Sequence, residues 1–261
     1  MRFSVVHRTV YDYKEPASES VGELRVCPRS SESQHVLSRT LRIEPDVKVS
    51  SFDDLWGNRV EYFSIPYRHD RLLVESEAEL ETFPQPSVEA YGDLTVAEAR
   101  QILNAGSIDL HDFRRPSRRV PTASVVGRLG LAAMMRGNRP LLDFLRDLNS
   151  WIHGNFRYVP GATDVGTPVA EVVAARAGVC QDFAHLMLSV LRTAGLPARY
   201  VSGYIEATVP GSGEEALVGA SASHAWVDVC LPGNVWWGLD PTNNQVCGER
   251  HVKVAVGRDY D

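Results

Sequence analysis

The sequence contains little cysteine, and what it has is scattered. The four cysteines lie at positions 27, 180, 230 and 247. No two of them form a C-x-x-C pair, so the sequence indicates neither a zinc site nor a redox dithiol. A low, scattered count is typical of reduced thiols in a cytosolic protein. We therefore expect a cytoplasmic protein with no metal and no cofactor.

Long apolar runs and an excess of basic residues are also missing. No run approaches the ~18 residues needed to span a membrane, and the first residues alternate like a strand rather than forming a signal peptide. The 27 Lys and Arg are outnumbered by 33 Asp and Glu, which gives a net charge of −6. A general nucleic-acid binder would need a basic footprint instead. We therefore expect a partner that is neither a membrane nor a nucleic acid.

What is present is the composition of an ordinary globular protein, with 44% apolar and 23% charged residues. The 261 residues are enough for one large or two medium domains. Residues 1–83 predict an all-β, sandwich-like domain, because short alternating segments are separated by turn signals such as Gly57-Asn58. The expected strands cover residues 3–11, 23–27, 35–43, 60–65 and 71–80. No residue of this domain suggests a reaction centre.

Helical patterns dominate the middle of the chain. Residues 84–139 predict a partly helical connector, with helices at residues 94–104 and 125–135. A second domain is expected over residues 140–261, and its first helix begins at Pro140, a proline at a permitted first-turn position. Thr167 and Pro168 are expected to be the N-cap and first residue of a short helix.

Strand patterns follow the helices in the second domain. They cover residues 198–207, 223–231 and 235–239, and a Gly-rich stretch at 209–219 predicts a surface loop. Helices followed by strands indicate the α+β class with an antiparallel sheet. We therefore expect an α+β domain preceded by the all-β domain.

The stretch Gly178–Gly195 predicts the central helix of this domain. Apolar or small residues recur at the spacing of a helix that faces a core, at Cys180, Phe183, Ala184, Met187, Leu188 and Leu191. Gly195 supplies a left-handed stop, and Pro197 cannot continue the helix. Backbone N–H groups and the positive end of the helix dipole gather around Cys180 and favour the thiolate, which is the nucleophilic form. The alternative is a plain core cysteine, since cysteine is among the most buried residue types.

A nucleophilic cysteine needs a base. His185 is the nearest histidine in sequence, but five positions place it about 140° around the helix from Cys180. Asp182 is turned about 200° away and is expected to favour the helix N-terminus as a charge. His224 is the better candidate, because it begins a strand whose other face is uniformly apolar or small and therefore predicts core.

Two aspartates compete to orient His224. Asp228 shares its face but lies roughly 13 Å along the strand, too far for a hydrogen bond. Asp240 lies beyond a turn signal at residues 232–234, and a hairpin centred near residue 232 would place it directly opposite His224, within carboxylate-to-imidazole reach. A register slip of two residues would bring Thr242 there instead. The other interpretation of Asp240 is a simple Asp-Pro turn.

These same residues carry a family resemblance. The segments GVCQDFAHLMLSVLRTAGLPARYVSGY, SHAWVDVCLP and WWGLDPTNN resemble the core of the transglutaminase-like superfamily, in particular its bacterial cysteine-protease-like members. HRTVYDY, LRVCPR and WGNRVEYF resemble that group's β-rich N-terminal domain. The resemblance places the family's catalytic triad at Cys180, His224 and Asp240. It also departs from papain, because Ala174 lies where papain-like proteases have an oxyanion-hole glutamine.

The resemblance implies a papain-like α+β core and acyl transfer on a peptide or protein amide through a thioester. The backbone N–H of Cys180 is expected to meet the oxyanion. Tyr158 is a candidate for the second donor or the substrate wall, with a core aromatic as the alternative, and Trp226 is a second candidate for the wall. Water as acceptor makes a cysteine protease or amidase, our first hypothesis, whereas an amine makes a transglutaminase. A non-catalytic binding or scaffold module is the third hypothesis.

Overall fold

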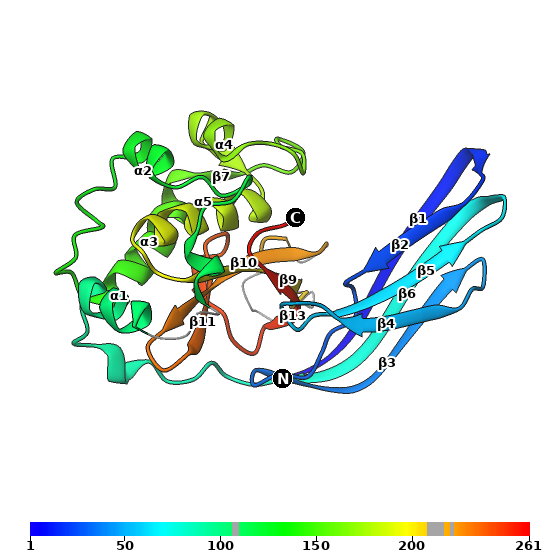
Figure 1. Cartoon of the computed structure of the whole chain (residues 1–261), viewed down its shortest axis with the longest axis horizontal. Helices are drawn as coiled ribbons and strands as arrows, with labels where there is room; N and C mark the ends of the chain where they lie inside the picture. Colours follow the sequence, from blue (N-terminus) through cyan, green and yellow to red (C-terminus); the bar gives the residue numbers. More distant parts are fainter. Residues whose placement is uncertain (106–109, 208–216, 220–221) are drawn as a thin grey trace. The chain divides into compact units, whose positions relative to one another are not determined.

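The protein, seen in a computed structural model, is described over residues 1–105, 110–207, 217–219 and 222–261. It divides into two compact units (Figure 1). The β unit consists of Met1–Pro84 and Glu249–Val256, and the α+β unit of Gln85–Gly248 and Gly257–Asp261. The division differs from the expected one because the connector is part of the α+β unit and because a late segment belongs to the β unit. Most of the predicted loop at 209–219 lies outside the described residues.

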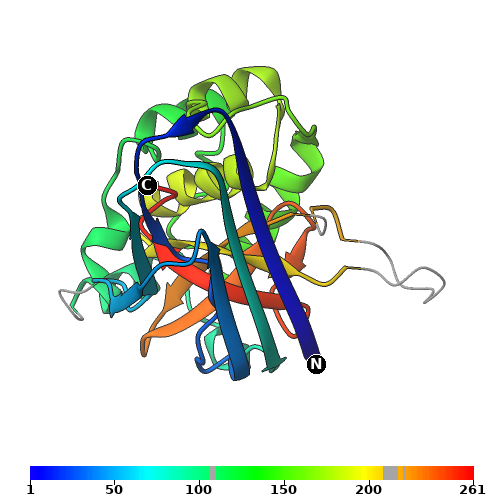
Figure 2. The ribbon, with the colours of Figure 1, turned by 90° about the vertical axis from the view of Figure 1, so that its right-hand side faces the viewer.

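The β unit contains two antiparallel sheets of three strands each, whose blue and cyan strands can be followed in Figures 1 and 2. The first sheet has the order β1-β6-β3, with β1 at Arg2–Ala17, β6 at His69–Thr82 and β3 at Gln34–Glu44. The second has the order β2-β5-β4, with β2 at Ser20–Leu24, β5 at Arg59–Ile65 and β4 at Val49–Asp53. Four of the five predicted strands are confirmed, and the one expected over residues 23–27 overlaps β2 only at its last two residues. The sequence pattern missed β4, a short strand whose residues are mostly exposed.

The core of the β unit lies between its two sheets. Strands of both sheets contribute buried side chains to one cluster, namely Ile43, Phe63, Ile65, Leu72 and Val74. Two side-chain amides hold β13 (His251–Gly257) to this unit. Gln34 binds the backbone of Lys253 with bonds of 2.7 and 2.8 Å, and Asn58 binds that of Val256 with bonds of 2.6 and 2.7 Å. These paired bonds explain why a segment from the end of the chain belongs to the β unit.

The α+β unit begins with helices. In chain order these are η1 (Glu89–Tyr91), α1 (Val96–Asn104), η3 (Asp112–Arg114), α2 (Ala123–Leu129), α3 (Leu141–Asn155), α4 (Val169–Ala175) and α5 (Cys180–Thr193). The helices predicted in the connector, at Pro140 and at Gly178–Gly195 are therefore confirmed as α1, α2, α3 and α5. The expected cap of α4 is wrong. Pro168 is the N-cap, and the Thr167 hydroxyl instead accepts the backbone N–H of Asp164 at 3.0 Å.

An antiparallel sheet follows, with the strand order β12-β11-β10-β9 inside this unit. Its strands are β9 (Ala198–Ile205), β10 (His224–Leu231), β11 (Val235–Asp240) and β12 (Gln245–Val246), and two short strands, β7 (Arg157–Tyr158) and β8 (Ala177–Gly178), pair in parallel. The predicted antiparallel α+β arrangement is thus confirmed. No helix in the described parts of the chain is long and apolar enough to cross a bilayer.

Helix α5 is the centre of the α+β core. It packs against β9 and β10 and also against α2, α3 and α4 (Figure 1). Because neighbours surround it, α5 is buried nearly all round rather than on one stripe. It ends at Gly195, which has the left-handed φ of +81° that the stop signal predicts.

Candidate active site

Cys180 is the first residue of α5, where the helix emerges from an extended N-cap at Val179. The Asp182 carboxylate accepts the Val179 backbone N–H at 2.8 Å and the Thr163 hydroxyl at 2.6 Å, so it caps the helix start as expected of a charge there. At 9% relative exposure, Cys180 is the most accessible of the four cysteines, all of which are buried and unpaired by disulfides. The thiol therefore lies at the positive end of a buried helix, next to solvent.

His224 and Asp240 form a buried pair. The imidazole Nε2 lies 2.9 Å from Asp240 Oδ2, and both side chains are fully buried. Burial by itself would lower the pKa of His224, but the hydrogen bond to Asp240 and the nearby Cys180 thiol outweigh it and raise the pKa to about 9. The imidazole is therefore held in its protonated form at neutral pH, with the Asp240 carboxylate bonded to one side of the ring.

The two sides of the ring are distinct. Asp240 is bonded to Nε2, while Nδ1 has no hydrogen-bond partner among the described residues. The nitrogen that remains for the Cys180 sulfur is therefore Nδ1. This is the order of groups that a nucleophile, its base and an orienting carboxylate require.

The hairpin register that brings the pair together differs from the predicted one. The strands β10 and β11 pair with Leu231 opposite Val235 and Val227 opposite Leu239. The turn between them contains Gly233 and Asn234, both in the left-handed region, and the hairpin is centred on Gly233 rather than on residue 232. Continuing this register places Asp240 opposite Trp226.

The two-residue slip does not separate His224 from Asp240. A shift of two keeps both residues on the same face of the sheet, because side chains alternate with a period of two. Diagonal neighbours are ~7–8 Å apart, within the reach of a histidine ring and a carboxylate. The predicted pair is thus brought together by a diagonal contact, and the direct cross-strand pairing was wrong.

Strand β10 also differs from the expectation on its second face. The face with Ala225 and Val227 belongs to the core as predicted. The His224 face is buried as well, and all eight residues of the strand are inaccessible. Of the three residues Cys180, His224 and Asp240, Cys180 at the start of α5 is the most exposed.

The sequence pattern missed Asn243, which holds Asp240 from behind. Its side-chain Nδ2 donates to Asp240 Oδ2 at 2.8 Å and to the Val218 carbonyl at 3.2 Å, while its Oδ1 accepts the Val218 N–H at 2.8 Å. Asp240 Oδ1 in turn accepts the backbone N–H groups of Thr242 and Asn243. The Asp-Pro turn is thus real, and it fixes the carboxylate rather than competing with that role. The available signal was an Asp followed by short polar residues that bond to nearby backbone.

Gly219 lies directly over the His224 ring. A Cβ on this glycine would come within 2.9 Å of His224 Nδ1 and 3.7 Å of the Tyr158 hydroxyl, and its φ of +94° also disfavours a side chain. Because Asn243 binds both backbone groups of Val218, the same amide positions the orienting carboxylate and the backbone next to the imidazole.

The two remaining candidates differ in their placement. Tyr158 is half-buried, packs edge-on against Phe183, and has its pKa raised by burial and by the charge of Cys180, so it lies beside the thiol as the substrate-wall role requires. Trp226 is only 1% exposed and lies against the His224 ring, with centroids 6.2 Å apart. The Trp226 ring therefore packs against the imidazole from within the core, and the expectation that Trp226 lines the substrate wall is wrong.

The excluded residues have other partners. His185 Nε2 accepts the Tyr260 backbone N–H at 3.3 Å, and burial lowers the pKa of His185 to about 4. Asp228 pairs with Arg199, whose two nitrogens lie 2.9 and 3.1 Å from Oδ2. Neither one is placed to serve His224.

The other cysteines are more deeply buried than Cys180. Burial raises the pKa of Cys27, and it raises the pKa of Cys230 to about 11. Within the described ranges, no group of three or more His, Cys, Asp or Glu side chains is arranged to hold a metal ion.

Comparison with known proteins agrees with this arrangement. Residues 130–241 match the family model of the transglutaminase-like superfamily, and residues 3–81 match that of the bacterial transglutaminase-like N-terminal region. An uncharacterised protein of Mycobacterium tuberculosis is 36% identical over 277 residues, which cover 99% of this chain and 84% of the relative. The chain belongs to the transglutaminase-like superfamily.

Within the superfamily, the chain has the architecture of the bacterial members that carry this N-terminal region. The crystal structure of a proposed cysteine protease from Cytophaga hutchinsonii is similar over 99% of this chain and 84% of that one, with 25% identity and a TM-score of 0.75. A protein-glutamine gamma-glutamyltransferase of Pseudomonas aeruginosa is 37% identical over 105 residues, 40% of this chain and 16% of the relative. Both the fold and the N-terminal β region are thus shared with known proteins.

Proposed function

We propose that the protein is a cysteine-dependent acyl transferase that acts on peptide or protein amides and most readily passes the acyl group to water, as a cysteine protease or amidase. One observation carries this proposal. The buried His224 ring is bonded to Asp240 at 2.9 Å, and this hydrogen bond together with the nearby Cys180 thiol outweighs burial and raises the pKa of His224 to about 9. A thiolate–imidazolium pair supplies both the nucleophile and the acid that amide cleavage needs.

In the first half-reaction, the Cys180 thiolate attacks the amide carbonyl and forms a carbon–sulfur bond while the carbonyl electrons move to oxygen. The Cys180 backbone N–H, at the start of α5, is available to this oxyanion, and the Tyr158 side chain, which lies near the Cys180 thiol, is the candidate second donor. The carbon–nitrogen bond then breaks, and the His224 imidazolium gives its proton to the leaving amine. A thioester and a neutral imidazole remain.

In the second half-reaction, neutral His224 takes a proton from the incoming acceptor, which attacks the thioester carbonyl. The carbon–sulfur bond breaks and the thiolate–imidazolium pair is restored. Asp240 stabilises the imidazolium in both half-reactions and stays ionised throughout. Water as acceptor gives a carboxylic acid, and a primary amine gives a new amide.

Amine transfer is the second candidate function. It is favoured by the resemblance of part of the chain to the Pseudomonas aeruginosa protein-glutamine gamma-glutamyltransferase. The same three residues serve either reaction, since the outcome depends on whether water or an amine reaches the thioester.

Product analysis separates these functions. The full chain is incubated with a library of glutamine-containing peptides, with and without a primary amine, and the products are identified by mass spectrometry. Free acid or cleaved peptide supports hydrolysis, and the amine adduct supports transamidation. Cys180→Ala is expected to abolish both. If the parent protein forms neither product across the library, the non-catalytic module becomes the better account.

A further inference from the structure

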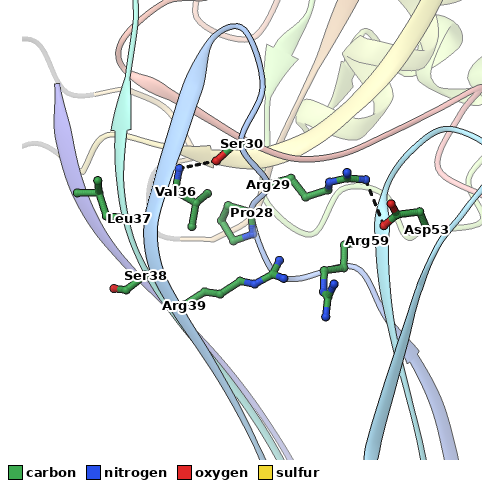
Figure 3. Close-up of a pocket in the computed structure, with 9 residues that line it drawn as sticks. All are labelled: Pro28, Arg29, Ser30, Val36, Leu37, Ser38, Arg39, Asp53 and Arg59. Carbon is green, nitrogen blue, oxygen red and sulfur yellow. Dashed lines mark hydrogen bonds and ion pairs between the residues drawn. The ribbon is translucent and has the colours of Figure 1, made fainter.

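The β unit has a hollow of about 520 Å³ that the catalytic proposal does not use (Figure 3). Its charged lining residues are three arginines and one aspartate, namely Arg29, Arg39, Arg59 and Asp53. A smaller hollow of about 250 Å³ adjoins it and shares Arg39 and Arg59. We call the larger hollow, defined by its three arginines, the arginine groove.

The arginine groove interrupts the apolar interior of the sandwich. Along β3, Ile43 lies opposite Val74, Leu41 opposite Ser76 and Arg39 opposite Ala78. Residues directly opposite share a face of the sheet, and the three partners on β6 are all buried. The row of inner-face side chains that begins with Ile43 in the core therefore ends with Arg39.

A β-bulge places Arg39 on this inner face. Val36 lies opposite Leu80, so an unbroken ladder would bring Ser38 opposite Ala78. The register shifts by one residue between Val36 and Ser38, and Arg39 takes that position instead. Bulges re-aim side chains in this way and are frequent next to functional sites.

Strand β5 of the other sheet shows the same change from apolar to charged side chains along its inner face. On β5, Phe63 and Ile65 belong to the core cluster, and strand alternation puts Glu61 and Arg59 on the same face. The small residues Ser76 and Ala78 on β6 leave room across from this polar end. An apolar sandwich would fill these positions with aliphatic side chains. Here Arg39 is instead exposed and Arg59 half-buried, and both line a hollow that a ligand can enter.

The charges in and beside the groove do not balance. Asp53 pairs with Arg29 at 3.3 Å, and Glu61 accepts from Arg59 Nε at 2.8 Å. The guanidinium of Arg39 forms no ion pair or hydrogen bond with any residue in the described ranges of the chain. Figure 3 shows the guanidinium groups of Arg39 and Arg59 directed into the same hollow. One positive charge therefore remains uncompensated next to a second guanidinium.

The walls of the groove are held in place. The Arg29 carbonyl accepts from the Gln34 side chain at 2.7 Å, and the Ser30 hydroxyl accepts the Val36 N–H at 2.9 Å while keeping its own O–H as a donor. Pro28 is buried beneath them. The backbone of this wall is therefore fixed, and the Ser30 hydroxyl is a further donor at the groove.

We propose that the arginine groove binds an oxyanion, a phosphate or carboxylate group, between the guanidinium groups of Arg39 and Arg59. The planar fork of a guanidinium matches both oxyanions through paired N–H···O bonds, and the bound anion would relieve the repulsion between the two cations. This site is independent of the function proposed for Cys180.

The test is a calorimetric titration of the full chain at constant ionic strength, with chloride as the background anion. Inorganic phosphate is one probe, and a short acetylated triglutamate amide is the carboxylate probe. Saturable binding of either probe supports the site, and the probe that binds identifies the source of the oxyanion. Absence of saturable binding with both probes overturns the proposal.

Two matched variants locate the binding. Arg39→Gln is expected to weaken binding by about tenfold or more, because hydrogen bonds to charged groups contribute ~1.5–3 kcal/mol, and to leave the melting temperature unchanged. Arg71→Gln removes the same charge from an exposed position on β6 outside the groove, and its affinity should equal that of the parent. An equal loss in both variants would mean that only general charge attraction is involved and would contradict the proposal.

Discussion

Two buried histidines of the α+β unit show opposite acid–base behaviour. His224 is 1% exposed and His185 3% exposed, so burial acts against the charged form of both. The hydrogen bond to Asp240 and the nearby Cys180 thiol nevertheless raise the pKa of His224 to about 9, whereas burial lowers the pKa of His185 to about 4. The difference lies in the partner, because His185 Nε2 accepts a backbone N–H from Tyr260, a bond that only an unprotonated nitrogen can make.

A histidine close to the cysteine along the chain is therefore not necessarily its base. His185 lies five residues from Cys180 on the same helix, and it is held neutral by its surroundings. His224 lies far along the chain and is held charged by a carboxylate. Three variants test this difference. They remove first the carboxylate charge of Asp240, then the hydrogen bonds of Asn243, and then the neutral imidazole of His185.

The largest effect is expected from Asp240→Asn. Removing the carboxylate charge makes the surroundings of His224 resemble those of His185, and the imidazolium loses its main support. We expect kcat/KM to fall by ~10³–10⁴, as when an orienting aspartate is neutralised in a triad, with an unchanged circular dichroism spectrum. Asp143→Asn, on an exposed position of α3, serves as the charge control. Activity equal to the parent would assign the orienting role to another residue.

A smaller loss is expected from Asn243→Ala. This change removes the 2.8 Å bond to Asp240 Oδ2 and both bonds to the Val218 backbone. We expect kcat/KM to fall about 10- to 100-fold, because hydrogen bonds to charged groups contribute ~1.5–3 kcal/mol.

The pH profile distinguishes this positioning role from a structural one. With less support for Asp240, the imidazolium should lose its proton earlier, so the alkaline limb of kcat/KM should move to lower pH. Asn155→Ala, which removes only a local bond to the Trp151 carbonyl, should leave the profile unchanged. A uniform loss of activity without a shift of the limb would make Asn243 structural.

The smallest effect on activity is expected from His185→Gln. This variant should instead change how the free energy of unfolding depends on pH. Because the pKa of folded His185 is lowered by burial to about 4 from 6.5, the unfolded chain binds the extra proton between these values. The stability contributed by neutral His185 is thus present above pH 6.5 and is lost as the pH falls towards 4. The loss is on the order of 2–3 kcal/mol.

Chemical denaturation at several pH values measures this contribution. The parent should lose more stability between pH 7 and 4 than His185→Gln, whose amide has no proton to gain. His224 contributes with the opposite sign, since its pKa of about 9 is above the unfolded value of 6.5. Its contribution is complete below pH 6.5 and is lost as the pH rises through 9. Equal pH slopes for the parent and His185→Gln would contradict the assignment of a neutral, buried His185.

Local sequence signals predicted helix α5 and the strand that begins at His224. The stop at Gly195 and the alternation of β10 depend on neighbouring residues only, and both were read correctly. The register of β11 was missed because it depends on the backbone conformation of Gly233 and Asn234, which lengthens the turn. The contact between His224 and Asp240 was nevertheless predicted, since a two-residue slip preserves the face.

Long-range features could not be predicted in the same way. The clamp of Asn243 requires its side chain to reach a distant backbone group at Val218, and no periodicity encodes that contact. The bulge that turns Arg39 inward looks like an ordinary strand in the sequence. For both residues, the contacts depend on strands and turns that are separate in the sequence and come together only in the folded protein.

The most direct test of the account is thiol labelling by iodoacetamide at pH 6, followed by peptide mass spectrometry. An ordinary thiol, with a pKa near 8.5, is almost unreactive at this pH, and burial raises the pKa of Cys27 and Cys230 further. We predict rapid modification of Cys180 alone, and slow modification of Cys180 in a His224→Ala variant that lacks the imidazolium. If Cys180 reacts no faster than Cys27 or Cys230, the thiolate–imidazolium pair does not exist and the catalytic account is wrong.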